Sequence, residues 1–314
     1  MSRHRSNLPQ LRDQLFLTDG GMETYLIFQQ GLELPDFASF HLLHTPAGEE
    51  AIRAYFRSYA DIARRYGTGM VLETPTWRAN ADWGVRHGLD AAALARINAR
   101  AVSLLEDLRD EFAPVTVVIS GCIGPRGDGY VPEAMMTVRG AEAYHQAQVD
   151  VLAATNADMV CAMTLNYVEE AIGITHAARK AGMPLAIAFT VETNGKLPTG
   201  QSLGSAIRIV DGATSGYPSY YMVNCAHPTH FAHVLDPEEH WVRRIRGIRA
   251  NASCRSHTEL NESTDLDTGD PLGLAASYAE LRRRLPQLTV LGGCCGTDHR
   301  HVEAIAAACT PVVA

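Results

Sequence analysis

The sequence predicts an α/β protein that forms one (β/α)8 barrel, and three observations favour this fold. Eight short apolar runs alternate with longer segments of helical periodicity over most of the 314 residues. Glycines and polar residues follow these runs directly, at the strand ends where the active site of such a barrel lies. The alternative, an open doubly wound sheet, is disfavoured because no Gly-x-Gly-x-x-Gly turn follows the first apolar run.

The predicted strands are the apolar runs that end in a turn-forming or polar residue. They cover residues 14–18, 69–73, 115–120, 158–163, 185–190, 220–223, 245–250 and 288–291. The run 245–250 has the weakest apolar pattern. Closure of the barrel would make the first and eighth strands neighbours and bring all carboxyl ends to one mouth.

The segments between these runs predict helices. The clearest cover residues 45–66, 90–112, 140–154, 167–181 and 299–308. Thr45-Pro46 is a typical helix start, and Asp90 is a predicted N-cap. We expect a single domain over residues 1–314. Within it, residues 1–14 are expected as a tail or a short amphipathic turn, and the polar segment 253–270 as a mobile loop or lid.

Composition argues against several classes of function. The formal charge of −8 and the lack of a basic run argue against a nucleic-acid partner. No apolar run approaches the roughly 18 residues of a membrane span, and the polar N-terminus does not resemble a signal peptide. Seven scattered cysteines, an odd number, do not suggest a disulfide framework. We therefore expect a cytoplasmic protein with reduced thiols and no membrane partner.

Three cysteines lie at predicted strand ends. Cys294 and Cys295 form a vicinal pair in LGGCCGT, residues 291–297, and Cys225 follows the sixth strand in YYMVNCAHP. Three thiolates with one open position are typical of a catalytic zinc site. Three reduced cysteines that merely pack as small apolar residues are the simpler alternative.

A mixed Cys/His site is a further alternative, because histidines follow both cysteine motifs. They are His227, His230, His299 and His301. All-sulfur ligation is favoured, since these histidines lie past the strand ends, in loops or helix starts.

Other residues at or after the strand ends are candidate substrate contacts. They are Asp19, Glu23, Glu73, Glu192, Thr164 and Asn224. A glutamate in such a place can equally cap a helix or pair with an arginine. Three aromatic rings near the mouth can face a cationic ligand or simply pack under loops; they are Trp77, Trp83 and Tyr130.

Six motifs, in order over nearly the whole chain, resemble the homocysteine S-methyltransferase family of zinc-dependent thiol/selenol methyltransferase barrels. They are DGGMETYL at 19–26, ETPTWRAN at 73–80, GCIGPRGDGY at 121–130, FTVETNGKLPTGQSL at 189–203, VNCAHP at 223–228 and GGCCGT at 292–297. The last two are the most specific. The resemblance implies that Cys225, Cys294 and Cys295 bind Zn²⁺. It also implies that Asp19 is a catalytic residue that holds the amino group of the substrate.

The implied reaction is methyl transfer from a small donor, such as S-methylmethionine, S-adenosylmethionine or a betaine, to the thiolate of homocysteine, giving methionine. The implied partners are therefore a small-molecule thiol and a methyl donor, and a homo-oligomer is compatible with the family. Thiols are weak nucleophiles until they are deprotonated, and zinc ligation achieves this. Methyl transfer then requires mainly alignment of the donor.

Two departures from the family pattern leave the acceptor open. Met163 stands where the family has a glutamate that also faces the substrate amino group. The segment after the seventh strand, RANASCRSHTELNES, differs from the Pro-Asn-rich motif of the family. Alternative functions are therefore a related methyltransferase with another thiol or selenol acceptor, a zinc-dependent barrel hydrolase, and a non-enzymatic zinc-holding or thiol-sensing protein.

Overall fold

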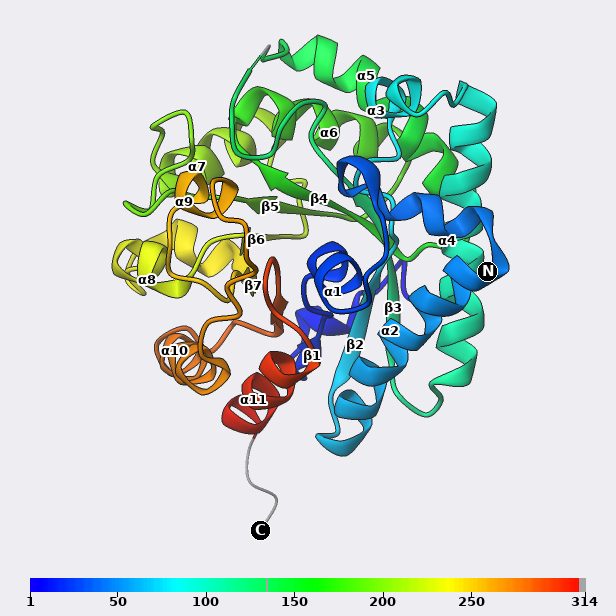
Figure 1. Ribbon diagram of the computed structural model, residues 1–314. Coiled ribbons are helices and arrows are strands. Elements are labelled where there is room, and N and C mark those ends of the chain that lie inside the picture. The colour runs from blue at the N-terminus through cyan, green and yellow to red at the C-terminus, as the bar shows by residue number, and fades with distance from the viewer. Residues whose placement is uncertain (134, 311–314) are drawn as a thin grey trace.

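The computed structural model describes residues 1–133 and 135–310, and its strands form a closed parallel barrel in sequence order (Figure 1). This confirms the predicted (β/α)8 fold as a single domain. The strands within the described residues are β1 (Phe16–Leu17), β2 (Gly69–Glu73), β3 (Val117–Ile123), β4 (Met159–Leu165), β5 (Leu185–Phe189), β6 (Tyr220–Asn224), β7 (Ile245–Ala250) and β8 (Val290–Gly293).

Helices surround the barrel on its outer face, and a few short helices lie at its mouth (Figure 1). They are α1 (Met22–Phe28), α2 (Pro46–Arg65), α3 (Ala81–Arg86), α4 (Ala91–Glu111), α5 (Val138–Ala153), α6 (Val168–Lys180), α7 (Leu203–Thr214), α8 (Pro228–Phe231), α9 (His257–Asn261), α10 (Pro271–Arg284) and α11 (His299–Cys309). The five predicted helices correspond to α2, α4, α5, α6 and α11. Thr45 and Asp90 cap α2 and α4 through their side chains, as predicted.

The barrel closes between β1 and β8. Phe16 of β1 lies opposite Gly69 of β2 on one side and Val290 of β8 on the other. The carboxyl ends of β6, β7, β8 and β1 therefore lie next to one another in the sheet. This adjacency brings the segments after β6 and β8 to the same part of the barrel mouth.

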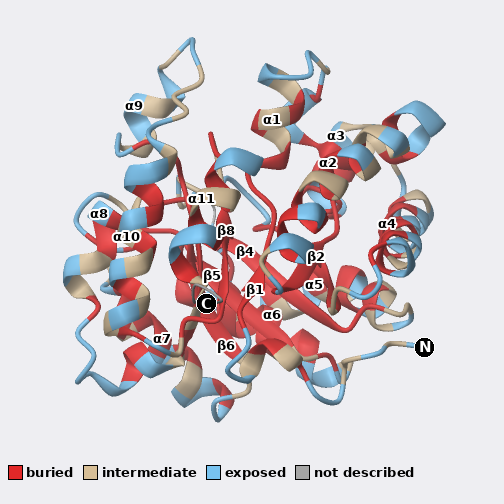
Figure 2. Ribbon diagram, turned by 90° about the horizontal axis from the view of Figure 1, so that it is seen from below, coloured by how far each residue is buried: buried red, intermediate tan, exposed pale blue. Residues whose placement is uncertain are grey.

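The strands are buried, whereas the outward faces of the helices are exposed (Figure 2). Helix α1 follows β1 and lies over the mouth of the barrel, at the same end as α9 (Figures 1 and 2). Side chains from several strands form a separate inner cluster that includes Phe16, Met159, Met163 and Met222. None of the helices in the described ranges is long and apolar enough to cross a membrane.

The N-terminal segment packs against the barrel and is therefore not a free tail. Backbone amides of Arg3 and His4 donate to Asp158 Oδ1 at 2.7 and 2.8 Å. Gln10, in the short 3-10 turn Pro9–Leu11, is fully buried, and its carbonyl accepts from Thr289 Oγ1 at 2.6 Å. Since Asp158 and Thr289 directly precede β4 and β8, this segment covers the amino ends of the strands.

The polar segment 253–270 contains the short helix α9, which starts with a capping box between Ser256 and Glu259. Ser253 Oγ also donates to Asp267 Oδ2 at 2.6 Å, which joins the two ends of this segment. Its mobility remains a prediction. Its position over the mouth matters for the site, because α9 begins at His257.

Candidate metal and active site

The sulfur atoms of Cys225, Cys294 and Cys295 lie within 4.8 Å of one another. Cys225 directly follows β6, and the vicinal pair directly follows β8. Three sulfurs on one tetrahedral zinc ion, with Zn–S bonds of about 2.3 Å, would stand roughly 3.8 Å apart. The three sulfurs therefore lie close enough together to converge on one ion, and the donor set suits zinc.

The structure has a disulfide between Cys225 and Cys294, and Cys295 is a free thiol. This differs from the reduced thiols that the sequence predicts, and it corresponds to an oxidised state of the three cysteines. Disulfide sulfurs carry no thiolate, so metal binding needs prior reduction and then loss of the thiol protons. Burial raises the pKa of the Cys295 thiol, which keeps this thiol protonated at neutral pH in the oxidised state.

Cys225 is held from the sides of β4 and β6. Asn224 Nδ2 lies 3.2 Å from Cys225 Sγ and donates to Thr164 Oγ1 at 2.8 Å. Thr164 N donates to Asn224 Oδ1 at 3.0 Å, and Thr164 Oγ1 lies 3.8 Å from Cys225 Sγ. The backbone of both Thr164 and Cys225 is left-handed, with φ of 60° and 53°. Such strain in residues other than glycine often marks functional sites.

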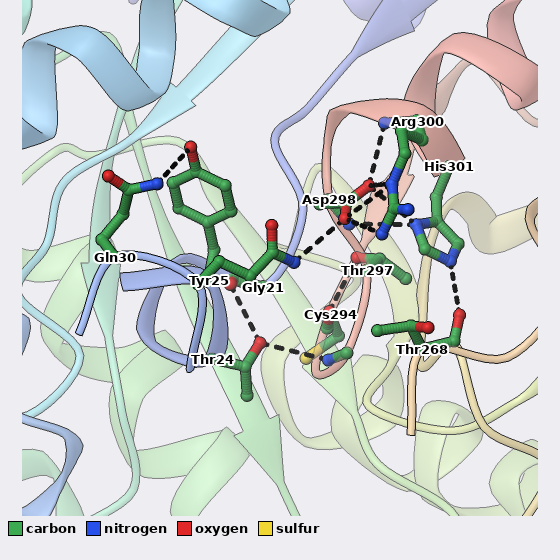
Figure 3. Close-up of polar contacts among 12 residues, drawn as sticks. Gly21, Thr24, Tyr25, Gln30, Thr268, Cys294, Thr297, Asp298, Arg300 and His301 are labelled. Carbon is green, nitrogen blue, oxygen red and sulfur yellow. Dashed lines mark hydrogen bonds and ion pairs between the residues drawn. The ribbon is translucent and has the colours of Figure 1, made fainter. Parts of the chain in front are cut away.

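The turn that carries Cys294 and Cys295 is held by the loop after β1 (Figure 3). Gly21 N donates to Thr297 O at 3.0 Å, and Gly296 N donates to Thr24 Oγ1 at 3.1 Å. A Cβ atom at Gly21 would clash with the carbonyl oxygen of Cys294. Gly296 has a φ of +78°, which favours glycine. The glycines thus permit the close approach and the sharp turn that place both cysteines at the mouth.

The four histidines near the motifs have other roles. His227 caps α8, His230 Nε2 donates to Cys254 O, and His301 Nε2 donates to Thr268 O, while His299 is exposed at the start of α11. Among the described residues, the only group arranged to hold a metal consists of the three cysteines. The geometry therefore favours all-sulfur ligation over a mixed Cys/His site.

Two aromatic side chains lie beside the sulfurs. Tyr130 Oη is 3.8 Å from Cys295 Sγ, and its ring centroid lies 4.4 Å from that of His257. His257 Nε2 donates to Cys225 O at 2.6 Å, and its Nδ1 lies 3.3 Å from Glu192 Oε1. Sequence reasoning identified Tyr130 but missed His257, which belongs to no motif and reaches the site only through the fold of the segment 253–270.

Asp19 lies at the mouth, but its charge is already paired. Its Oδ1 lies 2.8 Å from Arg249 Nη2, and its Oδ2 accepts from Tyr55 Oη at 3.1 Å. Burial alone would lower the pKa of Arg249, but the Asp19 carboxylate together with Glu73 and other neighbours raises it. The role of Asp19 in holding a substrate amino group remains a prediction, and any ammonium would have to share this carboxylate with Arg249.

Two glutamates predicted as substrate contacts are shifted toward the neutral form. Burial raises the pKa of Glu73 to about 8, and its Oε2 has no hydrogen-bond partner in the described part of the chain. Burial also raises the pKa of Glu23, whose Oε1 accepts from Ser39 Oγ at 2.8 Å. Met163 lies in the inner cluster beside Cys122. The mouth therefore offers a substrate ammonium little unpaired negative charge.

Comparisons with known proteins identify similar structures and a matching family. The chain is similar in structure to the homocysteine methyltransferase MmuM from Escherichia coli. For the oxidised form the TM-score is 0.76, with 21% sequence identity over 96% of this chain and 97% of that one. For the metallated form the TM-score is 0.74, with 20% identity over 94% and 96%. At this identity the likeness establishes the fold. Among curated protein sequences, none matches the chain.

The family model described as Homocysteine S-methyltransferase matches residues 16–309, from β1 to the end of α11. This range contains the three cysteines, Asp19 and all eight strands of the barrel. The chain therefore belongs to the homocysteine S-methyltransferase family and is a methyltransferase enzyme.

Proposed function

We propose that this protein, with its cysteines reduced, transfers a methyl group from a small onium donor to the thiolate of homocysteine or a close analogue. The observation that carries the proposal is the convergence of Cys225, Cys294 and Cys295 within 4.8 Å at the ends of β6 and β8. Zinc held by these three residues would deprotonate an incoming thiol and keep its sulfur nucleophilic. With homocysteine as the acceptor, the product is methionine.

The chain's own residues position the reactants. Asn224 and Thr164 fix the Cys225 sulfur, and the contacts of Gly21 and Thr24 fix the turn that bears the other two. As the new bond from acceptor sulfur to methyl carbon forms, the donor's bond from that carbon to sulfur or nitrogen breaks. The donor leaves as a neutral thioether or amine, so the step needs no general base. A reducing compartment such as the cytoplasm would keep the cysteines competent.

A second candidate is a methyltransferase of the same barrel with a different thiol or selenol acceptor. It is favoured by the pairing of Asp19 with Arg249 and by Met163 in the inner cluster, because both reduce the negative charge available for an ammonium. A zinc-dependent hydrolase is less well supported. Such sites usually use histidine or carboxylate ligands, and in the described ranges only the cysteines are arranged to hold a metal.

The test is a methyl-transfer assay on reduced, zinc-loaded protein. Homocysteine would be paired in turn with S-methylmethionine, S-adenosylmethionine and betaine, and methionine would be measured. A Cys295→Ser variant should lose both zinc and transfer, whereas a Cys254→Ser variant, which changes an exposed cysteine, should keep both. Transfer that survives in Cys295→Ser, or in metal-free wild-type protein, would contradict the proposal.

A further inference from the structure

Arg78 is a buried cation that has no counter-ion among the residues that the structure describes. It lies in the loop between β2 and α3, and only 7% of its surface is exposed. Its guanidinium carbon lies 4.1 Å from the ring centroid of Trp77 and 3.7 Å from that of Trp83. Nη1 donates to Gly127 O at 3.1 Å, but Nε has no hydrogen-bond partner in the part of the chain that the structure describes.

The charge of Arg78 is not satisfied within the protein. Asp128, Asp36 and Glu23 act on it through space, but none forms an ion pair with it among the described residues. Burial is the main cause that lowers the pKa of Arg78, to about 10, so the side chain stays protonated at neutral pH. Stacking on two indole rings stabilises a guanidinium, but it does not replace the hydrogen bonds of its Nε edge. This edge therefore lacks a hydrogen-bond acceptor in the described part of the chain, and an anionic ligand would supply one.

Arg78 lies at the same mouth of the barrel as the cysteine sulfurs. The loop between β3 and α5 accepts from Arg78 at Gly127, and three residues later Tyr130 Oη reaches to 3.8 Å from Cys295 Sγ. Between these contacts, a Cβ atom at Gly129 would stand 2.7 Å from Thr164 Cγ2 and 3.4 Å from the Trp77 ring. The loop thus packs between Trp77 and Thr164, beside the cysteines, and Arg78 shares the mouth with them.

We propose that Arg78 binds the carboxylate of an amino-acid-type substrate of the methyl-transfer reaction, which rests on the function proposed above. A guanidinium presents paired N–H groups that match the two oxygens of a carboxylate, whereas neighbouring acids disfavour a doubly charged phosphate. The acceptor homocysteine and donors such as S-methylmethionine or betaine all carry this carboxylate, so the experiment has to distinguish the two sources.

The experiment compares Arg78→Met and Arg78→Lys with the wild type in reduced, zinc-loaded protein. The acceptor arm uses homocysteine and its decarboxylated analogue 3-aminopropane-1-thiol. The donor arm uses S-methylmethionine and its decarboxylated sulfonium analogue. The matched control is Arg86→Met, since Arg86 stacks on the same Trp83 ring at 4.4 Å but is exposed. Because charge-assisted hydrogen bonds are lost, Arg78→Met should raise KM about 10- to 100-fold for the substrate whose carboxylate it binds.

For the decarboxylated analogue of that substrate, Arg78→Met should change KM little. The KM of Arg78→Lys should lie between those of the wild type and Arg78→Met. The control Arg86→Met should behave like the wild type. If Arg78→Met no longer distinguishes homocysteine from its decarboxylated analogue, Arg78 binds the carboxylate of the acceptor. If it no longer distinguishes S-methylmethionine from its decarboxylated analogue, Arg78 binds the carboxylate of the donor. Equal losses for both members of each pair, or the same loss in Arg86→Met, would overturn the proposal. If the wild type transfers no methyl group, the proposed function fails. Calorimetric titration of wild type and Arg78→Met with homocysteine, methionine and their decarboxylated analogues then decides the role of Arg78 independently.

Discussion

Arg249 Nη2 lies 2.8 Å from Asp19 Oδ1, and the two side chains are 7% and 2% exposed. Arg249 also donates from Nε to Gly293 O at 3.0 Å and from Nη2 to Gly20 O at 3.1 Å. The arginine therefore joins the ends of β1, β7 and β8 around one buried ion pair. This ion pair has a structural role, because it holds the cysteine turn. It also has a functional role, because it leaves less unpaired charge at the mouth.

The first prediction is that replacing one member of this ion pair destabilises the protein more than replacing both members. Arg249→Met leaves a buried carboxylate without its cation, which should lower the free energy of unfolding by about 3–5 kcal/mol. Asp19→Asn should cost a comparable amount, and the Asp19→Asn/Arg249→Met double variant should cost less than either single variant. Chemical denaturation of the four proteins measures this coupling. Additive costs would mean that the two side chains stabilise the fold independently.

The second prediction concerns the pH dependence of stability at Glu73. Its folded pKa is about 8, against an ordinary glutamate value of 4.5. Between these pH values the unfolded chain releases the proton and the folded protein keeps it, so the folded state loses stability as pH rises through this window. Above about pH 8 the loss levels off, at about 3–5 kcal/mol.

Glu73→Gln removes this titration. Relative to the wild type, its free energy of unfolding should rise steadily from about pH 4.5 to 8 and then stay level. Glu280→Gln, which changes an exposed glutamate of α10, is the control and should show no such trend. Parallel stability curves for wild type and Glu73→Gln would show that Glu73 is ionised in the folded protein throughout.

The third prediction is that Gly21 is required for the metal site. A Cβ at this position would push against Cys294 O, so Gly21→Ala should shift the cysteine turn, weaken zinc binding and cost about 1–3 kcal/mol of stability. Gly212→Ala is the matched control, because Gly212 lies in α7 with open space around it and alanine favours helices. Zinc affinity measured by competition with a chelator should fall only in Gly21→Ala. Equal affinity in both variants would refute the role of Gly21.

The fourth prediction concerns acceptor choice at Met163. This residue lies in the inner cluster next to Thr164, which contacts the Cys225 sulfur. Met163→Glu would add a carboxylate near the acceptor, so it should improve kcat/KM for homocysteine relative to 4-mercaptobutanoate, which lacks the amino group. An equal loss for both thiols would show that Met163 serves only to pack the inner cluster.

The sequence predicts the fold well because a barrel depends on local patterns. All eight strands and the caps at Thr45 and Asp90 could be located from apolar runs and cap residues. The convergence of the cysteines follows from the same topology, since β6 and β8 are separated only by β7.

Contacts between distant segments could not be predicted in this way. The pairing of Arg249 with Asp19 spans 230 positions and depends on which face of β7 the Arg249 side chain occupies, in the strand with the weakest pattern. His257 reaches Cys225 only because α9 folds over the mouth, and Arg78 has no ion-pair partner among the described residues only because of how two loops pack. The disulfide between Cys225 and Cys294 likewise has no signature in the spacing of the cysteines.

X-ray absorption at the zinc edge tests the central claim most directly. The reduced protein, loaded with one equivalent of zinc, should show three sulfur ligands at about 2.3 Å and one lighter ligand. Addition of homocysteine should raise the sulfur count to four, since the acceptor thiol takes the open position. A spectrum dominated by nitrogen or oxygen ligands, or a sulfur count that homocysteine leaves unchanged, would contradict the account.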